Sequence, residues 1–411
     1  MVERSWFSTQ LMFHRNENSH KTCLRCFTSS PAGCTDYVGT KVKSRRIRIY
    51  PTVQQKNLFS RWLGVSRKFY NEAAEWYNRK DKDTVNWMEV AKRLLHSHDE
   101  GYVKEVPYQI KKIAVKDAFQ AFMNGCRKAK QTGKPFSLKF RKRKDSVHSC
   151  YIPKSAITEK GVYSRIGGSM KMAERHLLSN AIADSRLVRE YGNKWYIVIP
   201  LSLGDTRLPS SENQGMGDVV AIDPGIRTFV TYFSENGHFG KIGSSFQELM
   251  SLHHRIDKLC SRIAHCKDKR KRMTLRRAQG RLRFRVRNLV DELHWKTVNF
   301  LVRNFSVIIL PTFGTSGMVR KEKRKIRKSV VRAMQSYRFF EFSERLALKC
   351  KEYGVLLLRS DESYTSMTNS FNGELMNIGS KAHFMHEGVR VDRDLNGARN
   401  ILLRAVRDSS L

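Results

Sequence analysis

The fold that this sequence predicts is decided by two stretches, Val219-Val220-Ala221-Ile222-Asp223-Pro224-Gly225-Ile226-Arg227 and Val391-Asp392-Arg393-Asp394-Leu395-Asn396-Gly397-Ala398-Arg399-Asn400-Ile401-Leu402. The first is an apolar run that indicates a buried strand and delivers an aspartate into a Pro-Gly turn. The second places Asp394 at the start of a helix with one apolar side. Two carboxylates that are far apart in the sequence therefore stand at the ends of elements, which is the arrangement that a two-metal nuclease site needs.

The charge balance of the chain predicts a polyanionic partner. Lys and Arg number 77 against 38 Asp and Glu among 411 residues, and the formal net charge is +39. Solubility alone does not require so large an excess, so nucleic acid is the expected partner. A membrane surface is the second candidate, but we expect no membrane association because we find no signal peptide and no apolar run of spanning length.

The eight cysteines show no paired framework of a secreted domain, which predicts a reduced, intracellular protein. Residues 1–43 are polar and irregular and predict a mobile N-terminal extension. His20, Cys23, Cys26 and Cys34 offer one chelating Cys-x2-Cys pair, so zinc binding there stays open beside the mobile tail.

Residues 44–205 predict a domain of strands with a helical insertion at about 52–130. The apolar and charged residues of 46–50 alternate, which indicates a half-buried strand, and Thr52 can cap the helix that follows. The stripe Leu58, Trp62, Val65 and Phe69 supports this helix. We predict a second helix over 108–126 and further strands over 136–141 and 194–200. The domain is expected to be a small β-barrel or sheet.

Residues 206–217 predict a linker because they are rich in Ser, Gly, Asn and Pro. The domain predicted over 218–411 begins with a hairpin of strands at 219–222 and 228–233. A long amphipathic helix through Leu249 and Ile263 comes next, and strands at 307–310 and 355–358 alternate with helices. This order of elements, with hairpin strands first and strand–helix alternation afterwards, is RNase H-like. The predicted fold class is therefore α+β for the first domain and α/β for the second.

Two basic segments have more than one interpretation. The helical stretch 276–287 carries arginines on most faces, and we favour nucleic-acid contact over a solvated surface. The run 321–328 has three interpretations: a segment that binds a nucleic-acid strand, a nuclear import signal, or a solvated loop.

The chain resembles TnpB and its eukaryotic and viral relatives, the Fanzor proteins, over about residues 44–406. The similarity rests on six segments in order: Arg46-Ile47-Arg48-Ile49-Tyr50-Pro51, Arg67-Lys68-Phe69-Tyr70-Asn71, Phe136-Ser137-Leu138-Lys139-Phe140, Ile222-Asp223-Pro224-Gly225, Tyr364-Thr365-Ser366 and Asp392-Arg393-Asp394-Leu395-Asn396-Gly397-Ala398-Arg399-Asn400. The resemblance implies a transposon-encoded, RNA-guided DNA endonuclease. It also implies a WED domain with a REC insertion, followed by a RuvC nuclease domain.

One departure concerns the second acidic residue. TnpB proteins place a glutamate after the strand of the second RuvC motif, where this chain has Pro311. Fanzor-type members instead have a glutamate just before the Tyr-Thr-Ser sequence, and Glu362 occupies that position. The resemblance is therefore of the Fanzor type.

The other departure concerns cysteines. The family has two Cys-x2-Cys pairs in this region, which would fall at Asn369 and Asn372 and near Met385 and Gly388. No cysteine follows Cys350, and His383 and His386 alone cannot complete a four-coordinate zinc site. We expect no structural zinc in the degenerate knuckle segment 364–390, and this puts the nuclease activity in question.

The hypothesis for the site is that Asp223, Glu362 and Asp394 hold two Mg²⁺ or Mn²⁺ ions about 4 Å apart, with Asp223 bridging them. Each acid has another interpretation: Asp223 opens a turn, Asp394 favours a helix N-terminus, and Glu362 is a surface acid. Asp361, Glu341 or Glu344 could replace Glu362. We expect Asp392 to support Arg393 or a helix cap.

Contacts to nucleic acid are expected from basic residues in both domains: Arg67, Lys68, Lys139, Arg141, Arg281, Arg285, Arg393 and Arg399. The resemblance implies a guide RNA from the transposon end, a double-stranded DNA target and a monomer bound to RNA, in the nucleus if the host is eukaryotic or viral. Two alternatives stay open: a guided binding protein with impaired cutting, and a guide-independent DNA-binding accessory.

Overall fold

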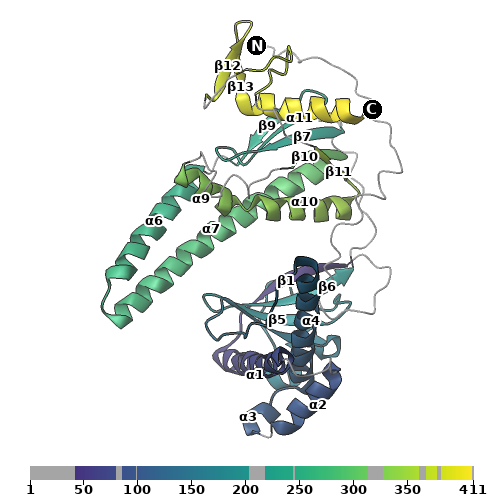
Figure 1. Ribbon diagram of the computed structural model, residues 1–411, viewed down its shortest axis with the longest axis vertical. Helices are drawn as coiled ribbons and strands as arrows, with labels where there is room; N and C mark the ends of the chain where they lie inside the picture. Colours follow the sequence, from purple (N-terminus) through teal and green to yellow (C-terminus); the bar gives the residue numbers. More distant parts are fainter. Residues whose placement is uncertain are drawn as a thin grey trace. The chain divides into compact units, whose positions relative to one another are not determined.

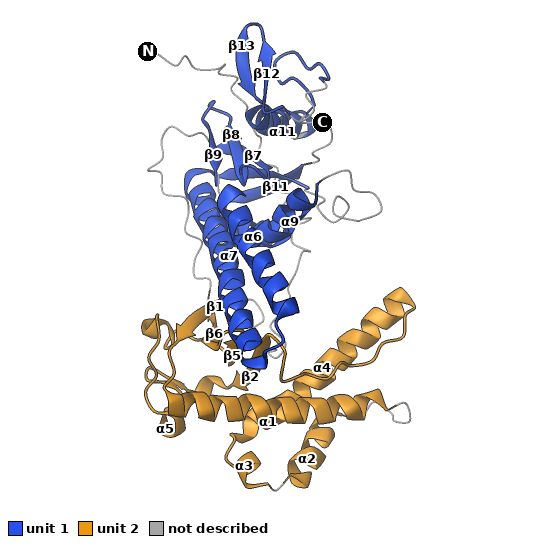
Figure 2. Ribbon diagram, turned by 90° about the vertical axis from the view of Figure 1, so that its left-hand side faces the viewer, with its two compact units in different colours: residues 1–22, 205–411 blue, residues 23–204 orange. Residues whose placement is uncertain are grey.

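The computed structural model describes residues 42–79, 86–98, 100–202, 218–243, 246–312, 327–360, 367–376 and 381–409. They fall into two compact units: an N-terminal unit that ends at Gly204, and a C-terminal unit that holds the described residues from Asp218 onward (Figure 2). The predicted N-terminal extension lies outside the described residues except for Val42 and Lys43, which belong to the first strand. The predicted linker 206–217 also lies outside them.

The N-terminal unit is built on an antiparallel sheet of four strands in the order β1-β6-β5-β2. Four helices stand between its first two strands in the sequence, and a small hairpin of β3 and β4 precedes β5. The elements of this unit are β1 (Val42–Ile49), α1 (Val53–Asn78), α2 (Trp87–Ser97), α3 (Gly101–Lys104), α4 (Tyr108–Thr132), β2 (Val147–Ile152), β3 (Ile157–Thr158), β4 (Gly161–Val162), α5 (Ser164–Gly167), β5 (Ser185–Glu190) and β6 (Lys194–Ser202).

Helix α1 begins where the sequence predicts it. Thr52 Oγ1 accepts a hydrogen bond from the Gln55 backbone N–H, and the Gln55 side chain accepts one from the Thr52 N–H, which forms a capping box. Phe59, Trp62 and Phe69 are fully buried in the core that α1 shares with α4 and the sheet. This core fixes α1 against the apolar side of the sheet.

The predicted strand over 136–141 is wrong. The segment is extended but does not pair with a strand, because side chains of α1 satisfy its backbone instead. The Asn78 side chain bonds both the N–H (2.8 Å) and the C=O (3.0 Å) of Leu138. Asn71 does the same for Arg141, at 2.8 and 3.0 Å. An alternating sequence therefore runs along a helix here, with two asparagines in the place of a neighbouring strand.

The C-terminal unit contains a mixed sheet of five strands in the order β11-β10-β7-β8-β9. Strands β7, β8 and β9 form an antiparallel meander, and β10 and β11 run parallel to β7. The elements are β7 (Val219–Pro224), β8 (Val230–Ser234), β9 (Phe239–Ile242), α6 (Phe246–His265), α7 (Lys269–Asn304), β10 (Val307–Pro311), α9 (Lys328–Tyr337), α10 (Phe339–Tyr353), β11 (Leu356–Ser360), β12 (His383–His386), β13 (Val389–Asp392) and α11 (Arg393–Ser409).

Helices cover both faces of this sheet, as Figure 1 shows, with α11 on one face and α7 and α10 on the other. The alternation of side chains along β7 produces the two layers. Val220 and Ile222 are buried in the core with α6, α7 and α10, whereas Val219 and Ala221 are buried against α11. The strands and helices predicted for this half are present, with shifts of a few residues at their ends.

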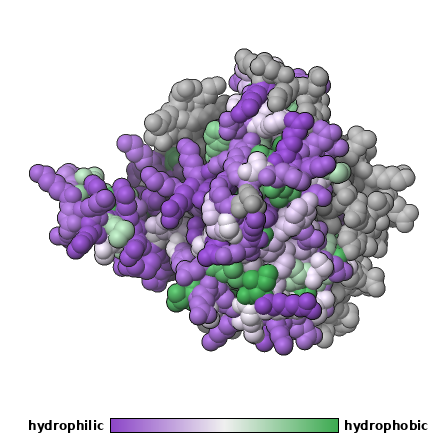
Figure 3. Space-filling view, turned by 90° about the horizontal axis from the view of Figure 1, so that it is seen from below, coloured by the Kyte–Doolittle hydropathy of each residue, from purple (hydrophilic) through white to green (hydrophobic). Residues whose placement is uncertain are grey.

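The surface is predominantly polar, in keeping with the composition. Figure 3 shows one face, on which hydrophilic side chains dominate and hydrophobic ones form small patches. No helix among the described residues combines the length and the apolarity needed to cross a bilayer. Most of the very basic segment 321–328 lies outside the described residues; Arg327 directly precedes α9, and Lys328 begins it.

Candidate functional site

Strand β7 carries Asp223 toward helix α11. Val219 and Ala221 pack on α11, and Asp223 is the next residue on this side of the strand. A Cβ atom placed on Gly397 of α11 would lie 2.8 Å from Asp223 Oδ2. The carboxylate of Asp223 therefore lies directly against the helix, at a position where any side chain larger than that of glycine would displace it.

Asp394 lies in the first turn of the same helix, three residues before Gly397. Residues three apart share a helix face, so the structure brings Asp394 and Asp223 to the same end of the C-terminal unit. Both aspartates are partly exposed. Glu362 and Asp361 lie outside the described residues, so the third ligand of the hypothesis has no position here.

The turn after Asp223 is tight and fixed at both ends. A Cβ on Gly225 would lie 2.7 Å from the backbone oxygen of Thr228, so the turn requires glycine there. The Gly225 N–H donates to the Phe229 C=O (3.1 Å), and the buried Phe229 ring stacks on His294 of α7, with 5.2 Å between ring centroids. A buried core residue thus anchors the loop that follows the first aspartate.

Asp392 caps α11, which is one of the two roles expected from the sequence. Its Oδ1 accepts hydrogen bonds from the N–H groups of Asp394 (3.0 Å) and Leu395 (3.2 Å), and its Oδ2 accepts one from Lys241 Nζ (2.6 Å). Burial acts to raise the pKa of Asp392, but Lys241 and the two N–H groups outweigh it and hold this pKa below its ordinary value. The cap fixes the backbone that presents Asp394.

The donor set suits a hard divalent cation. Carboxylate oxygens are the ligands that Mg²⁺ prefers, and one or two carboxylates together with water and substrate phosphate suffice for it. Within the described ranges no group of three His, Cys, Asp or Glu side chains is placed to hold a metal ion. The two aspartates therefore fit a Mg²⁺ site that substrate or a further acid would complete.

The segment of the predicted degenerate knuckle is held by polar and aromatic contacts. Asn369, at the first expected cysteine position, bonds the N–H of Phe371 through Oδ1 (3.1 Å). Its Nδ2 therefore faces His386 Nδ1 as a donor, at 3.1 Å. The Phe371 ring stacks on His386 (4.8 Å), and Arg399 lies over Phe371 (4.7 Å). Asn372, Met385 and Gly388 occupy the other expected cysteine positions.

Side chains of helix α11 hydrogen-bond to the backbone of this segment. The buried Asn396 accepts from the Ser370 N–H (2.9 Å) and donates to the Thr368 C=O (2.8 Å), as one strand would to another. Asn400 also donates to the Thr368 C=O (2.6 Å), and Arg399 donates to the Ser370 C=O (3.0 Å). The helix that presents Asp394 is thus tied to the segment 368–370, which comes well before it in the sequence.

The basic residues proposed for nucleic-acid contact have different surroundings in the N-terminal unit. Lys68 pairs with Glu100 (2.9 Å), and Arg141 lies 3.6 Å from Asp117 and stacks over Tyr70. Lys139 is exposed, and Arg67 is half-buried.

In the C-terminal unit, Arg281 and Arg285 project from α7, and Arg285 lies 3.9 Å from Glu248. The Arg393 N–H donates to the Ala382 C=O. Arg399 is half-buried in the contacts described above, and burial lowers its pKa.

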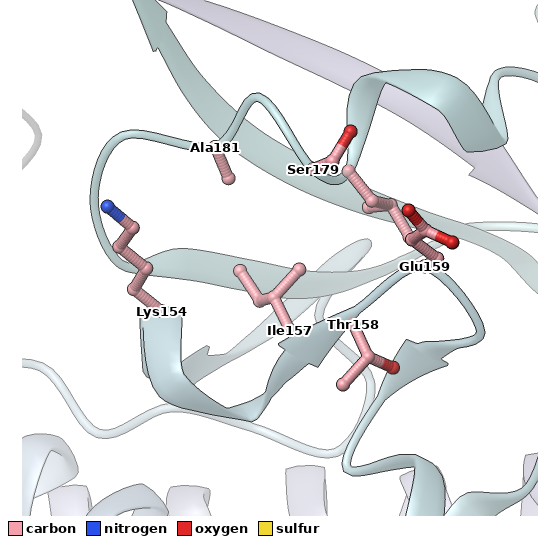
Figure 4. A pocket seen from close by; sticks show the side chains of 7 residues that line it. Lys154, Ile157, Thr158, Glu159, Ser179 and Ala181 are labelled. Atoms are coloured by element: carbon pink, nitrogen blue, oxygen red, sulfur yellow. The ribbon is translucent and has the colours of Figure 1, made fainter.

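One pocket of about 220 Å³ lies in the N-terminal unit, near β3 (Figure 4). Lys154, Glu159 and Ser179 are among its lining residues, and none of the predicted site residues is. It is smaller than the usual ligand cavity, and we assign no site to it.

Sequence reasoning missed Gly397, which makes room for Asp223. A signal was present, because glycine inside a helical pattern is costly and usually marks a close approach of two segments. It also missed Asn71 and Asn78, whose role depends on segments 60–70 residues away and has no local signal.

Two family models match parts of the chain. One is the TNB domain of the Cas12f1-like family, over residues 339–401, and the other is a helix-turn-helix domain named after OrfB of IS605, over residues 42–80. The first covers α10 to α11, including Asp394, and the second covers β1 and the single long helix α1.

Viral proteins match over most of their length. The putative transposase A625R of Paramecium bursaria Chlorella virus 1 is 26% identical over 402 residues, which cover 90% of this chain and 88% of that protein. The TnpB-like protein L770 of Acanthamoeba polyphaga mimivirus is 23% identical over 393 residues, covering 88% and 73%.

Solved structures that resemble the chain include a Cas12f1–sgRNA–target DNA complex and a mini-RNA-guided endonuclease, CRISPR-Cas phi3. The first has a TM-score of 0.33 and 17% identity and covers 88% of this chain and 99% of that one. The second has a TM-score of 0.46 and 9% identity, covering 91% and 94%. The family models and the viral relatives together support a TnpB/Cas12f-like family for this chain.

Proposed function

We propose that this chain is a transposon-encoded DNA endonuclease that a guide RNA directs and that divalent metal ions activate. The observation that carries the proposal is the position of Asp223 against Gly397, within one helical turn of Asp394. The TnpB-like and transposase relatives support the nuclease class, and the net charge of +39 supports a nucleic-acid substrate.

Asp223 and Asp394 are proposed to hold two Mg²⁺ or Mn²⁺ ions. Bound there, the ions would neutralise the phosphodiester charge and lower the pKa of the attacking water. Glu362 stays the proposed third ligand, and its place before the Tyr-Thr-Ser sequence is the basis for proposing a Fanzor-type member.

The strand order of the C-terminal unit supports an RNase H-like, RuvC-type nuclease domain. An antiparallel meander is followed by two strands parallel to the first, and the two aspartates come from the first strand and from the last helix. The residues of this chain hold the acids in place: Gly225 closes the turn after Asp223, and Asp392 fixes the start of the helix that carries Asp394.

The N-terminal unit, proposed as the WED domain with its REC insertion, would grip the guide and the target. In guided systems base pairing reads the target, and the protein reads duplex shape and a short flanking motif. The basic residues proposed for this contact are Arg67, Lys68, Lys139 and Arg141, with Arg281, Arg285, Arg393 and Arg399 in the C-terminal unit.

The proposal is tested by sequencing the RNA that copurifies with the chain and using it in a plasmid cleavage assay with Mg²⁺. We expect Asp223→Ala and Asp394→Ala to reduce cleavage by a factor on the order of 10³ or more, because groups that act as a unit fail together. Asp408→Asn is the matched control, because Asp408 is exposed on the same helix as Asp394.

The outcomes separate the alternatives. Bound RNA without cleavage would make the chain a guided binding protein, and absence of a defined RNA would make it a guide-independent accessory. If Glu362→Ala leaves cleavage unchanged, the third ligand is another residue.

A further inference from the structure

Three arginines lie near one another where α1 faces the sheet of the N-terminal unit. Arg67 comes from α1, Arg143 from the turn before β2, and Arg189 from β5. The strand register pairs Arg189 with His148 of β2. We call Arg67, Arg143 and Arg189 the arginine cluster.

Specific contacts place Arg189 in this cluster. Its Nη1 donates to Ser60 Oγ of α1 (3.4 Å), and its guanidinium lies over the Trp195 ring (5.7 Å). Arg67 follows Ser60 by seven residues, which is two helical turns, so both lie on the same side of α1. The guanidinium of Arg189 is therefore directed at the side of α1 that carries Arg67.

A short turn brings Arg143 to the same place. Asn71, one turn after Arg67, holds the backbone of Arg141 through two hydrogen bonds. The turn that follows is closed by Asp145, whose Oδ2 accepts from the Lys142 N–H (2.7 Å). Arg143 is exposed inside this turn, between α1 and the start of β2.

The positive charges of the cluster act on one another. Burial lowers the pKa of Arg189 most, and Arg67 and Arg143 lower it further. Burial, Arg189 and Arg67 lower the pKa of His148 in the same way, and Asp145 offsets part of this. Like charges held this close destabilise the fold unless an anion lies between them.

Several other arginines of this unit have carboxylate partners. Arg45 pairs with Glu174, Arg46 with Glu190, and Arg186 with Asp117, at 2.6–2.7 Å. No ion pair joins the arginine cluster to a carboxylate within the part of the chain that the structure describes. Within the described residues, these three therefore lack the carboxylate partner that Arg45, Arg46 and Arg186 have.

We propose that the arginine cluster binds a phosphate group of a nucleic-acid backbone. The guanidinium fork matches phosphate oxygens, and three such groups from separate segments can surround one phosphate. The exposed Arg143 and the half-buried Arg67 and Arg189 leave the site open to solvent. The inference deepens the proposed function, on which it rests, by naming where the N-terminal unit holds a phosphate.

The test compares Arg189→Gln and Arg67→Gln with Arg127→Gln, which removes an exposed arginine of α4. The full chain, freed of bound nucleic acid, is titrated with a labelled RNA–DNA hybrid duplex at several salt concentrations. We expect each cluster variant to bind about tenfold more weakly and to lose about one unit of salt slope, because one phosphate contact is lost. The control should match the unaltered protein.

Thermal unfolding distinguishes a binding role from a structural one. Without an anion, Arg189→Gln should melt at the same temperature as the unaltered protein or higher, because repulsion is relieved. Inorganic phosphate should raise the melting temperature of the unaltered chain more than that of the variant if a free anion suffices. If only the duplex does so, the site requires a backbone phosphate. Unchanged affinity and salt slope, or a lower melting temperature with unchanged affinity, would overturn the proposal.

The two proposals fail separately. A chain that cuts nothing, but loses duplex affinity on Arg189→Gln and not on Arg127→Gln, keeps the phosphate site and loses the endonuclease. A chain that cuts with its guide while the affinities of all three variants agree keeps the endonuclease and loses the phosphate site.

Discussion

The C-terminal unit should lose stability between neutral pH and pH 4 because of one buried imidazole. His294 is fully buried on α7, where its Nε2–H donates to the Tyr337 C=O (2.7 Å). Its Nδ1 lies 3.2 Å from Arg345 Nη1, a group that only donates, so Nδ1 must accept and the ring is neutral. Protonation would place an N–H⁺ group against a guanidinium.

The size of the effect follows from the shift in pKa. Burial is the largest cause and lowers the pKa of His294 to about 4, from about 6.5 in the unfolded chain. Between these values the unfolded state binds a proton that the native state excludes, so stability falls as the pH falls. At about 1.4 kcal/mol per pH unit, His294 removes about 2 kcal/mol between pH 7 and pH 5.

The assay is urea unfolding followed by far-ultraviolet circular dichroism, with one transition fitted for each unit. His294→Gln does not titrate in this range and keeps an amide donor for the Tyr337 C=O. Its C-terminal transition should lose about 2 kcal/mol less than that of the unaltered protein between pH 7 and pH 5. Other acids and histidines cancel in this difference.

Equal pH dependence in both proteins would refute the reasoning, because it would mean that His294 already carries its proton or that the ring is solvated. The result also bears on the site, since His294 stacks on Phe229, whose backbone closes the turn after Asp223.

Three other changes test separate parts of the structure. Gly397→Val should displace the Asp223 carboxylate and reduce Mg²⁺-dependent cleavage about 100-fold with the fold intact by circular dichroism, and full activity would show that the helix does not confine this acid. Asn78→Ala should destabilise the N-terminal unit by about 1–3 kcal/mol in urea, because it leaves both backbone groups of Leu138 unpaired, whereas an unchanged midpoint would mean that water replaces the amide. The pKa of Asp392 is lowered in the folded state, so its contribution to stability is complete above about pH 4 and is lost as the pH falls through the folded value. Asp392→Asn should therefore reduce the loss of unfolding free energy at acid pH, and an unchanged loss would contradict the capping role.

Much of the C-terminal unit could be predicted because its signals are local. The apolar run 219–222 cannot be exposed. Its side chains point alternately to the two faces of the sheet, toward α11 and toward α7, as strand geometry requires. The closeness of Asp223 to the helix of Asp394 was expected only through the family resemblance. Nothing local in the sequence states that this strand and this helix meet.

The failures have a common physical cause. The alternating pattern at 136–141 reports that one side of an extended segment is buried, but not which group satisfies its backbone. Asn71 and Asn78 satisfy it here, from 60 to 70 residues earlier in the chain. The arginine cluster was missed for a similar reason, because its members are separated by up to 122 residues and only the folded sheet brings them together.

Because β7 is buried on both faces, its length is constrained during evolution. Inserting or deleting one residue before Asp223 would reverse the parity of the strand, sending Ile222 toward α11 and the carboxylate into the hydrocarbon layer on the opposite side. A change of two residues would keep odd and even positions on their own sides. Insertions and deletions in this strand should therefore be tolerated only when they change its length by an even number of residues. The loops outside the sheet have no such constraint.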